Sequence, residues 1–220
     1  MNWRLPNQLT VARIALAGAF FTLLGLYELP TPTQPHTSGR WLLNIAFVVY
    51  LIAGVTDVLD GYLARKWNIV SAFGRIADPF VDKVLVVGAF AMLAGSNFAL
   101  PPEAHAQRIA PGWATGHMAS AVQAWMVVVI LCREFLISAM RGYSESQGVK
   151  FPATSAGKIK MFVQSAAICT ALYQMANLPE APWAIYTRTI LVWLAVAITA
   201  LSGLAYVGKA RRVFRRTEKD

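Results

Sequence analysis

Long apolar segments alternate with short polar connections along almost the whole chain. Each of these segments approaches or exceeds the roughly 20 residues that an α-helix needs to cross the hydrocarbon core of a bilayer. Their approximate ranges are 8–28, 41–63, 77–99, 119–141, 159–177 and 184–207. The pattern therefore predicts an all-α integral membrane protein with six transmembrane helices.

The longer connections are rich in residues that end helices. Segments 29–40 and 100–117 contain three prolines each, and segment 178–183 contains two, which is typical of turns and loops. The first apolar segment lies where a signal peptide would lie. However, its apolar run is too long, Arg13 interrupts it and no clear cleavage site ends it, so we expect a retained helix.

Composition excludes two classes of protein. Hydrophobic residues make up 56% of the 220 residues and charged residues only 14%, which fits neither a soluble globular domain nor a disordered chain. The two cysteines, Cys132 and Cys169, both lie in apolar segments and are too few for a disulfide framework or a zinc site. We expect one membrane-embedded unit over 1–220, with a short interfacial segment at 1–7.

Basic residues indicate how this unit lies in the membrane. They outnumber acidic residues by 20 to 11, which gives a net charge of +9. Only Arg40, Arg108 and Arg188 fall on one side of the predicted membrane, and the other 17 fall on the opposite side. Because cytoplasmic segments carry the excess of Lys and Arg, both termini are predicted to be cytoplasmic. The basic tail, 208–220, is expected to lie on anionic lipid headgroups rather than on nucleic acid.

Four of the five aspartates fall within 26 residues, at the cytoplasmic ends of the second and third predicted helices. Asp57 and Asp60 are three residues apart, and Asp78 and Asp82 are four apart, so each pair shares one helix face. The connection between the two helices is expected to include Asn68, Ser71 and Gly74. Antiparallel helices joined in this way would bring the four carboxylates together.

Four uncompensated carboxylates could not coexist there, and a hard divalent cation would resolve the repulsion. Because the donors are all carboxylate oxygens, they favour Mg²⁺ or Mn²⁺ over Zn²⁺, and four of them suit two ions better than one. Two alternatives are a proton or cation pathway and salt bridges to Arg65, Arg75 and Lys83.

Small residues and one arginine accompany the aspartates. Gly61 and Gly74 leave room for a ligand to approach the backbone, Ala64 is small and one turn beyond Asp60, and Arg65 offers a positive charge to a phosphate. Metals held by carboxylates commonly bind phosphates. The alternative for the glycines is tight helix packing within the membrane.

The spacing of these residues resembles the signature of the CDP-alcohol phosphatidyltransferases. Eight positions match it at fixed gaps: Asp57, Asp60, Gly61, Ala64, Arg65, Gly74, Asp78 and Asp82. Three further segments, 5–13, 133–141 and 156–160, look like parts of bacterial phosphatidylglycerophosphate synthases within that family. The similarity covers nearly the whole chain and is weakest in the two long loops and the last predicted helix.

This resemblance implies a six-helix membrane enzyme, commonly a homodimer, in the bacterial inner membrane with its active site facing the cytoplasm. Such an enzyme transfers the phosphatidyl group of CDP-diacylglycerol to an alcohol and releases CMP. By carry-over, Asp57, Asp60, Asp78 and Asp82 hold the metal, and Asp82 is the candidate general base. The CDP-lipid site would be formed by Asn7, Thr10, Asp57, Gly61, Ala64, Arg65 and Gly74.

The acceptor is predicted from a second group of charges. Arg133 and Arg141 lie about two helical turns apart on the fourth predicted helix, and Lys158 and Lys160 open the fifth. Fixed cations there suit an acceptor that carries a phosphate, such as sn-glycerol 3-phosphate, although the excess of cytoplasmic basic residues would also explain them. Glu134 either pairs with a basic neighbour or faces solvent.

Three other functions stay open at this point. A cardiolipin synthase or a phosphatidylinositol-phosphate synthase of the same fold would use a different acceptor. A membrane cation transporter would use the aspartates as a transport site, but it predicts ionisable residues near the bilayer midplane and leaves Gly61, Ala64 and Arg65 unexplained.

Overall fold

The structure is a computed structural model that describes residues 5–29, 39–67, 72–105, 109–147 and 155–217. Within these ranges, the backbone alone is described for 5–10, 60–79, 82, 103, 105, 145, 155–156 and 207–217.

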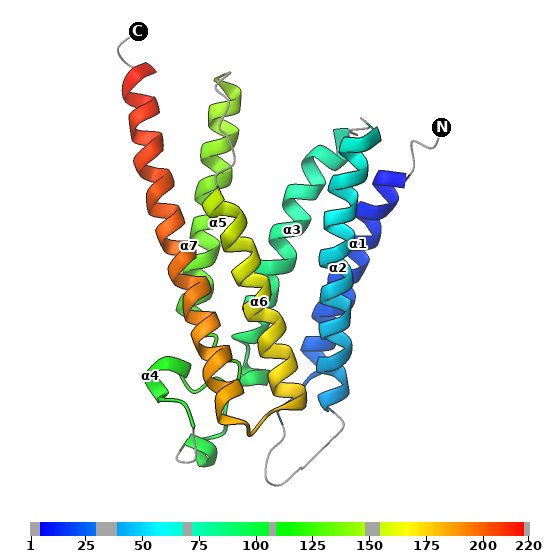
Figure 1. Cartoon of the computed structure of the whole chain (residues 1–220), viewed down its shortest axis with the longest axis vertical. Helices are drawn as coiled ribbons and strands as arrows, with labels where there is room; N and C mark the ends of the chain where they lie inside the picture. Colours follow the sequence, from blue (N-terminus) through cyan, green and yellow to red (C-terminus); the bar gives the residue numbers. More distant parts are fainter. Residues whose placement is uncertain (1–4, 30–38, 68–71, 106–108, 148–154, 218–220) are drawn as a thin grey trace.

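Six long α-helices make up most of the described residues, and they run alternately up and down (Figure 1). They are α1 (Leu5–Leu26), α2 (Arg40–Trp67), α3 (Ala72–Leu93), α5 (Ala124–Ser146), α6 (Ser155–Asn177) and α7 (Pro182–Thr217). α1 begins and α7 ends at the same end of the bundle, where α2 also ends and α3 begins. The all-α prediction is confirmed for the described residues, in which one isolated β-bridge, Ala99 with Met118, occurs.

The connection between α3 and α5 is longer at both ends than the predicted ranges allow. The third helix was expected to reach residue 99, but it ends at Leu93, and Ser96–Phe98 forms the 3₁₀ helix η2. The fourth was expected from residue 119 but begins at Ala124. The Ser120 hydroxyl donates to the Leu93 carbonyl and accepts from the Val122 amide, so it stabilises a turn in place of helix.

Two shorter helices complete this connection, η3 (Pro102–His105) and α4 (Gly112–Thr115). At the other end of the chain, α7 continues to Thr217, ten residues past its predicted end at 207. Its basic residues are good helix formers, and the helix is about 54 Å long.

The helices pack around a core of large apolar side chains. α1 lies against both α2 and α3, α6 lies against α2 and α7, and α5 lies against α7. Phe20, Leu43, Phe90 and Leu172 are fully buried within this core. The core therefore fixes α1 beside the two helices that carry the aspartates.

Apolar side chains also cover the outside of the bundle. Val58, Phe162 and Leu204 are each at least 70% exposed, as expected for side chains in contact with lipid rather than water. Two described helical segments, Arg40–Leu59 and Pro182–Tyr206, are long and apolar enough to cross a membrane, and Val11–Leu26 and Lys83–Leu93 are shorter apolar segments. These features indicate a membrane protein.

Candidate active site

Asp57, the first of the four aspartates, forms an ion pair with an arginine of α1. The Arg13 Nη1 atom lies 2.9 Å from the Asp57 Oδ1 atom. The arginine side chain is 1% exposed and the aspartate side chain 35% exposed. A buried cation therefore orients one oxygen of a carboxylate that stays partly accessible. The salt-bridge partners considered from the sequence were Arg65, Arg75 and Lys83. Arg13 was not among them.

The other three aspartates are placed by their backbones. Asp60 lies near the end of α2, and Asp78 and Asp82 lie in the first half of α3. These two helix segments meet at the same end of the molecule (Figure 1). The side chains of these aspartates lie outside the described residues, so their convergence on a metal stays a prediction. Among the residues whose side chains are described, no group of three or more His, Cys, Asp or Glu side chains gathers.

The residues predicted to bind the CDP-lipid lie on the same three helices. Asn7 and Thr10 fall in the first turns of α1, and Gly61, Ala64 and Arg65 fall in the last turns of α2. Gly74 was expected in the connection, but α3 begins at Ala72, so it lies in the first turn of that helix. The side chains of this group are not described.

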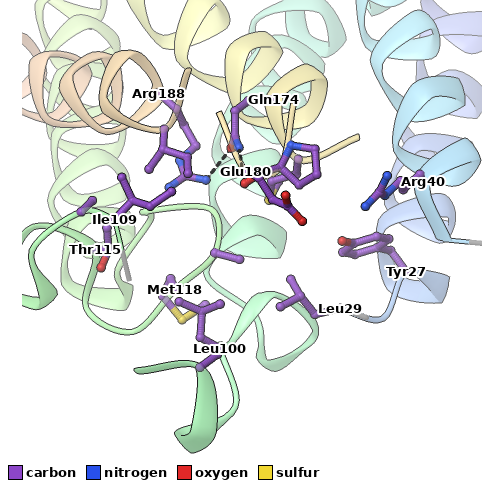
Figure 2. A pocket seen from close by; sticks show the side chains of 16 residues that line it. Tyr27, Leu29, Arg40, Leu100, Ile109, Thr115, Met118, Gln174, Glu180 and Arg188 are labelled. Atoms are coloured by element: carbon purple, nitrogen blue, oxygen red, sulfur yellow. Dashed lines mark hydrogen bonds between the residues drawn. The ribbon is translucent and has the colours of Figure 1, made fainter. Parts of the chain in front are cut away.

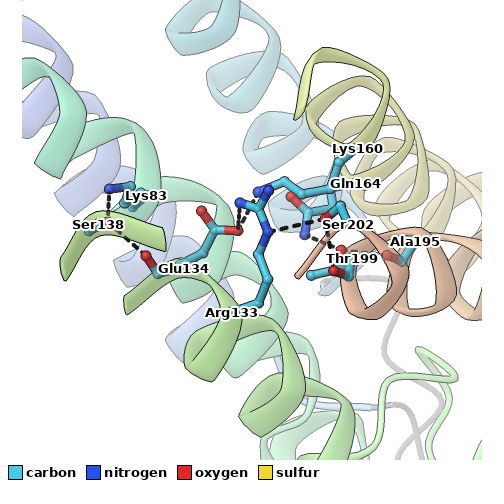
Figure 3. Close-up of polar contacts among 9 residues, drawn as sticks. All are labelled: Lys83, Arg133, Glu134, Ser138, Lys160, Gln164, Ala195, Thr199 and Ser202. Carbon is cyan, nitrogen blue, oxygen red and sulfur yellow. Dashed lines mark hydrogen bonds and ion pairs between the residues drawn. The ribbon is translucent and has the colours of Figure 1, made fainter. Parts of the chain in front are cut away.

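The predicted acceptor residues Arg133 and Lys160 meet at one carboxylate, as Figure 3 shows. Arg133 Nη1 donates to Glu134 Oε1 at 3.1 Å, and Lys160 Nζ donates to the same oxygen. All three side chains are about nine-tenths buried or more. Glu134 therefore pairs with its basic neighbours, which settles the alternative that the sequence left open. Two cations around one carboxylate leave a net positive charge that can attract an anion.

Helix α7 holds Arg133 from the other side. Arg133 Nε donates to the Ser202 hydroxyl at 3.1 Å, and its guanidinium carbon lies 5.8 Å from the centre of the Tyr206 ring. At Gly203, an added Cβ atom would lie 3.1 Å from the Arg133 Cγ atom. The arginine is therefore fixed between α5 and α7 by a hydrogen bond, a ring and a close backbone approach.

A second contact joins this cluster to the helix that carries Asp78 and Asp82. Lys83 Nζ donates to the Ser138 hydroxyl, and that hydroxyl donates to the Glu134 carbonyl oxygen at 2.7 Å (Figure 3). Lys83 directly follows Asp82 in the chain. The cationic cluster on α5 and α6 is thereby linked to α3 close to the candidate general base.

Arg141 and Lys158 are placed differently from the other two predicted acceptor residues. Both are exposed, and neither has a hydrogen bond or an ion pair among the described residues. Arg141 lies eight residues beyond Arg133 on α5, about 12 Å along the helix axis. Of the four predicted residues, the structure thus joins Arg133 and Lys160 in one network and leaves Arg141 and Lys158 at the surface.

Sequence reasoning missed two contributors to these sites, Arg13 and Ser202. A signal for Arg13 was available, because an arginine inside an apolar segment needs a partner. No local signal marks Ser202, which lies 69 residues from Arg133 in the chain.

The donor chemistry fits a hard cation near Asp57, because its carboxylate is partly exposed and carboxylate oxygens are ligands that Mg²⁺ and Mn²⁺ prefer. The cationic cluster on α5 and α6 can attract phosphate groups. Comparison with known proteins agrees with this chemistry.

A family model described as CDP-alcohol phosphatidyltransferase matches residues 3–201. A curated relative from Bacillus subtilis (strain 168), named CDP-diacylglycerol–glycerol-3-phosphate 3-phosphatidyltransferase, is 33% identical over 215 residues, covering 94% of this chain and 95% of its own. Proteins of the same name from Rickettsia bellii and Escherichia coli (strain K12) are each 29% identical, covering 96% of this chain and 97% of their own. The match spans nearly the whole chain and contains all the predicted site residues, and the chain therefore belongs to the CDP-alcohol phosphatidyltransferase family.

Proposed function

We propose that this protein transfers the phosphatidyl group of CDP-diacylglycerol to sn-glycerol 3-phosphate, forming phosphatidylglycerophosphate and CMP. The names of the relatives from three bacteria support the reaction and both substrates. The structural observation that carries the choice of acceptor is the buried pair Arg133 and Lys160, held by Glu134. Fixed cations favour the binding of an acceptor that carries a phosphate, and they do not favour the binding of choline or ethanolamine.

All six long helices cross the membrane in this proposal, as one unit over 1–220. Both termini and the aspartates then lie on the cytoplasmic side of a bacterial inner membrane, with segment 1–7 at the interface and the basic tail, 208–220, on anionic headgroups. The start of α1 and the end of α7 lie at the same end of the bundle, which supports an even number of crossings. The active assembly is expected to be a homodimer, as the family resemblance implies.

Two divalent ions, Mg²⁺ or Mn²⁺, would be held by Asp57, Asp60, Asp78 and Asp82. Bound there, such ions would offset the negative charge of the diphosphate during the displacement. Arg13 holds Asp57 in one orientation through its Oδ1 atom. This contact holds Asp57 in place before the ion binds. Such positioning of groups accounts for much of the rate gain in phosphoryl transfer.

The nucleotide end of the donor would lie along Gly61, Ala64, Arg65 and Gly74, with Asn7 and Thr10 at its border. Small residues allow the backbone to approach the diphosphate closely. Arg65 supplies a guanidinium group suited to a phosphate.

The displacement then takes place at the lipid-side phosphorus of the diphosphate. Asp82 accepts the proton of the acceptor hydroxyl, and the resulting oxygen forms a bond to that phosphorus. The bond from phosphorus to the bridging oxygen breaks, and its electron pair leaves with CMP. Arg133 and Lys160 hold the acceptor phosphate during this step. Arg141 and Lys158, being exposed, would attract it from solvent.

The test is CMP release by purified protein in detergent with CDP-diacylglycerol and Mg²⁺. Glycerol 3-phosphate, inositol phosphate, phosphatidylglycerol and serine are supplied in parallel. Release with glycerol 3-phosphate alone is expected. Release with phosphatidylglycerol or inositol phosphate instead would indicate a cardiolipin synthase or a phosphatidylinositol-phosphate synthase, and would remove the acceptor role of Arg133 and Lys160. No release with any acceptor from folded protein would favour cation transport.

A further inference from the structure

A cavity of about 360 Å³ (Figure 2) is lined by residues at the end of the bundle where α2 and α7 begin, opposite to the end where α2 stops and α3 starts (Figure 1). It lies among the beginnings of α2 and α7, the end of α6 and the connection between α3 and α5. Its walls are mostly apolar, with Leu100 and Met118 on one side. A few polar side chains face the same space, and one of them, Arg188, is buried.

Arg188 has donor capacity that the described residues do not use. Its side chain belongs to a residue only 5% exposed. Nη1 donates to Gln174 Oε1 at 2.5 Å, and Nε has no hydrogen-bond partner among the described residues. An unsatisfied buried donor is costly, and more so on a charged group. Because Arg188 lines the cavity, a group bound there can reach its guanidinium group.

Gln174 fixes the direction in which Arg188 points. Its amide nitrogen donates to the carbonyl oxygens of Leu178 and Pro179, at 2.9 and 3.4 Å. The amide oxygen is then directed at the guanidinium group, as Figure 2 shows. The turn between α6 and α7 thus holds Gln174, and Gln174 holds Arg188, so the cation is positioned before any ligand binds.

Among the described side chains that line it, the cavity carries a net positive charge. Arg188 and Arg40 line it together with one described carboxylate, Glu180. Glu180 is exposed and forms no ion pair with Arg188. A buried cation without a carboxylate partner is expected to attract an anion. Guanidinium groups match phosphate oxygens especially well.

We propose that this cavity binds a phosphate group, supplied either by the headgroup of an anionic phospholipid or by free phosphate. Arg188 lies six residues into α7, about 9 Å from its first residue. In the orientation proposed above, this depth corresponds to the non-cytoplasmic headgroup region. The apolar wall beside Arg188 favours the lipid source, because it can cover the chain attached to the phosphate. The site is separate from the proposed active site and does not depend on that assignment.

The side chain of Arg188 itself can report on the cavity. Full-length protein labelled with ¹⁵N-arginine in a neutral detergent gives Nε–H signals in solution NMR, and the Arg188 signal is the one absent from Arg188→Gln. If that variant does not fold, Arg188→Lys identifies the same signal. Two titrations follow, one with inorganic phosphate and one with short-chain phosphatidylglycerol.

A saturable shift of the Arg188 signal is expected with phosphatidylglycerol, at a concentration at least about tenfold lower than with phosphate. Burial of two methylene groups already accounts for such a factor. Equal affinities would support the phosphate site with free phosphate as its source. No shift with either compound up to about 10 mM, a very weak affinity, would overturn the proposal.

Two variants make the test specific. Gln174→Glu places a carboxylate beside Arg188 and should weaken both titrations at least about tenfold, because the guanidinium is then neutralised within the protein. Gln147→Glu, the same amide-to-carboxylate change at an exposed residue directly after α5, should leave both titrations unchanged. Unaltered binding in Gln174→Glu would also overturn the proposal.

Discussion

Arg13 of α1 and Asp57 of α2 form an ion pair across two helices, 2.9 Å apart, at the first aspartate of the family signature. The pair joins a nearly inaccessible guanidinium to a carboxylate that remains about one-third exposed. The charge of Asp57 is thus already partly offset within the protein. A metal ion bound by Asp57 would share this carboxylate with Arg13 rather than neutralise it alone.

Arg13→Gln is therefore expected to destabilise metal-free protein by about 2 kcal/mol, at the lower end for a buried pair because Asp57 is partly exposed. The loss should become smaller when Mn²⁺ is added, since the ion then takes over the neutralisation of Asp57. Thermal unfolding in EDTA and in Mn²⁺ measures both values. An equal loss in the two conditions would show that Asp57 does not ligate the ion.

Glu134 is expected to act as a positioning residue for the acceptor. Glu134→Ala removes the carboxylate that holds Arg133 and Lys160 together, so the KM for glycerol 3-phosphate should rise about tenfold or more. The KM for CDP-diacylglycerol should change by less than about twofold, because the donor is expected to bind on α1, α2 and α3.

Gln164→Met is the matched control for this change. Gln164 lies one turn beyond Lys160 on α6 and donates to Thr199 at 2.9 Å, outside the charged cluster. The Gln164→Met change should leave the KM for glycerol 3-phosphate unchanged. If Glu134→Ala raises both Michaelis constants equally, the residue supports the fold of the site rather than the acceptor.

Asp82→Asn should abolish turnover while preserving the fold. The amide is close in size to the carboxylate, but it cannot accept the proton of the acceptor hydroxyl at neutral pH. A loss of at least about 100-fold in kcat is expected, the lower range for a general base. CMP release and the thermal unfolding midpoint should be measured on the same preparation. A near-normal kcat would remove Asp82 as the base.

Gly88→Ala should destabilise the contact between α1 and α3. A Cβ atom at Gly88 would lie 2.4 Å from the Phe21 Cζ atom, so the ring must move, at a cost of about 1–3 kcal/mol. Gly54→Ala, where nothing lies within 4 Å of the added atom, is the matched control. It should leave stability unchanged or raise it slightly, since alanine is the better helix former. Equal effects of the two changes on the unfolding midpoint would contradict this packing.

The order of the helices could be predicted because it depends on local properties. Apolar runs and prolines mark α1, α2 and α6 to within a few residues. The boundaries failed where a side chain competes with the helix, as Ser120 does at the start of α5. The length of α7 was underestimated because its end is polar, and hydropathy alone does not mark a polar helix.

For the site, the sequence by itself determined which candidate functional residues lie on which helix. Helical periodicity relates nearby residues directly, so the spacing puts Asp57 with Asp60, and Asp78 with Asp82, each on one helix face. These aspartates and the small residues around them also carry the resemblance to the family. Only the tertiary structure decided which partners meet from different helices. Lys160 reaches Glu134 across 26 residues, and Arg133 reaches Ser202 across 69. Such contacts depend on how each helix is rotated and packed against the next, which no local pattern encodes.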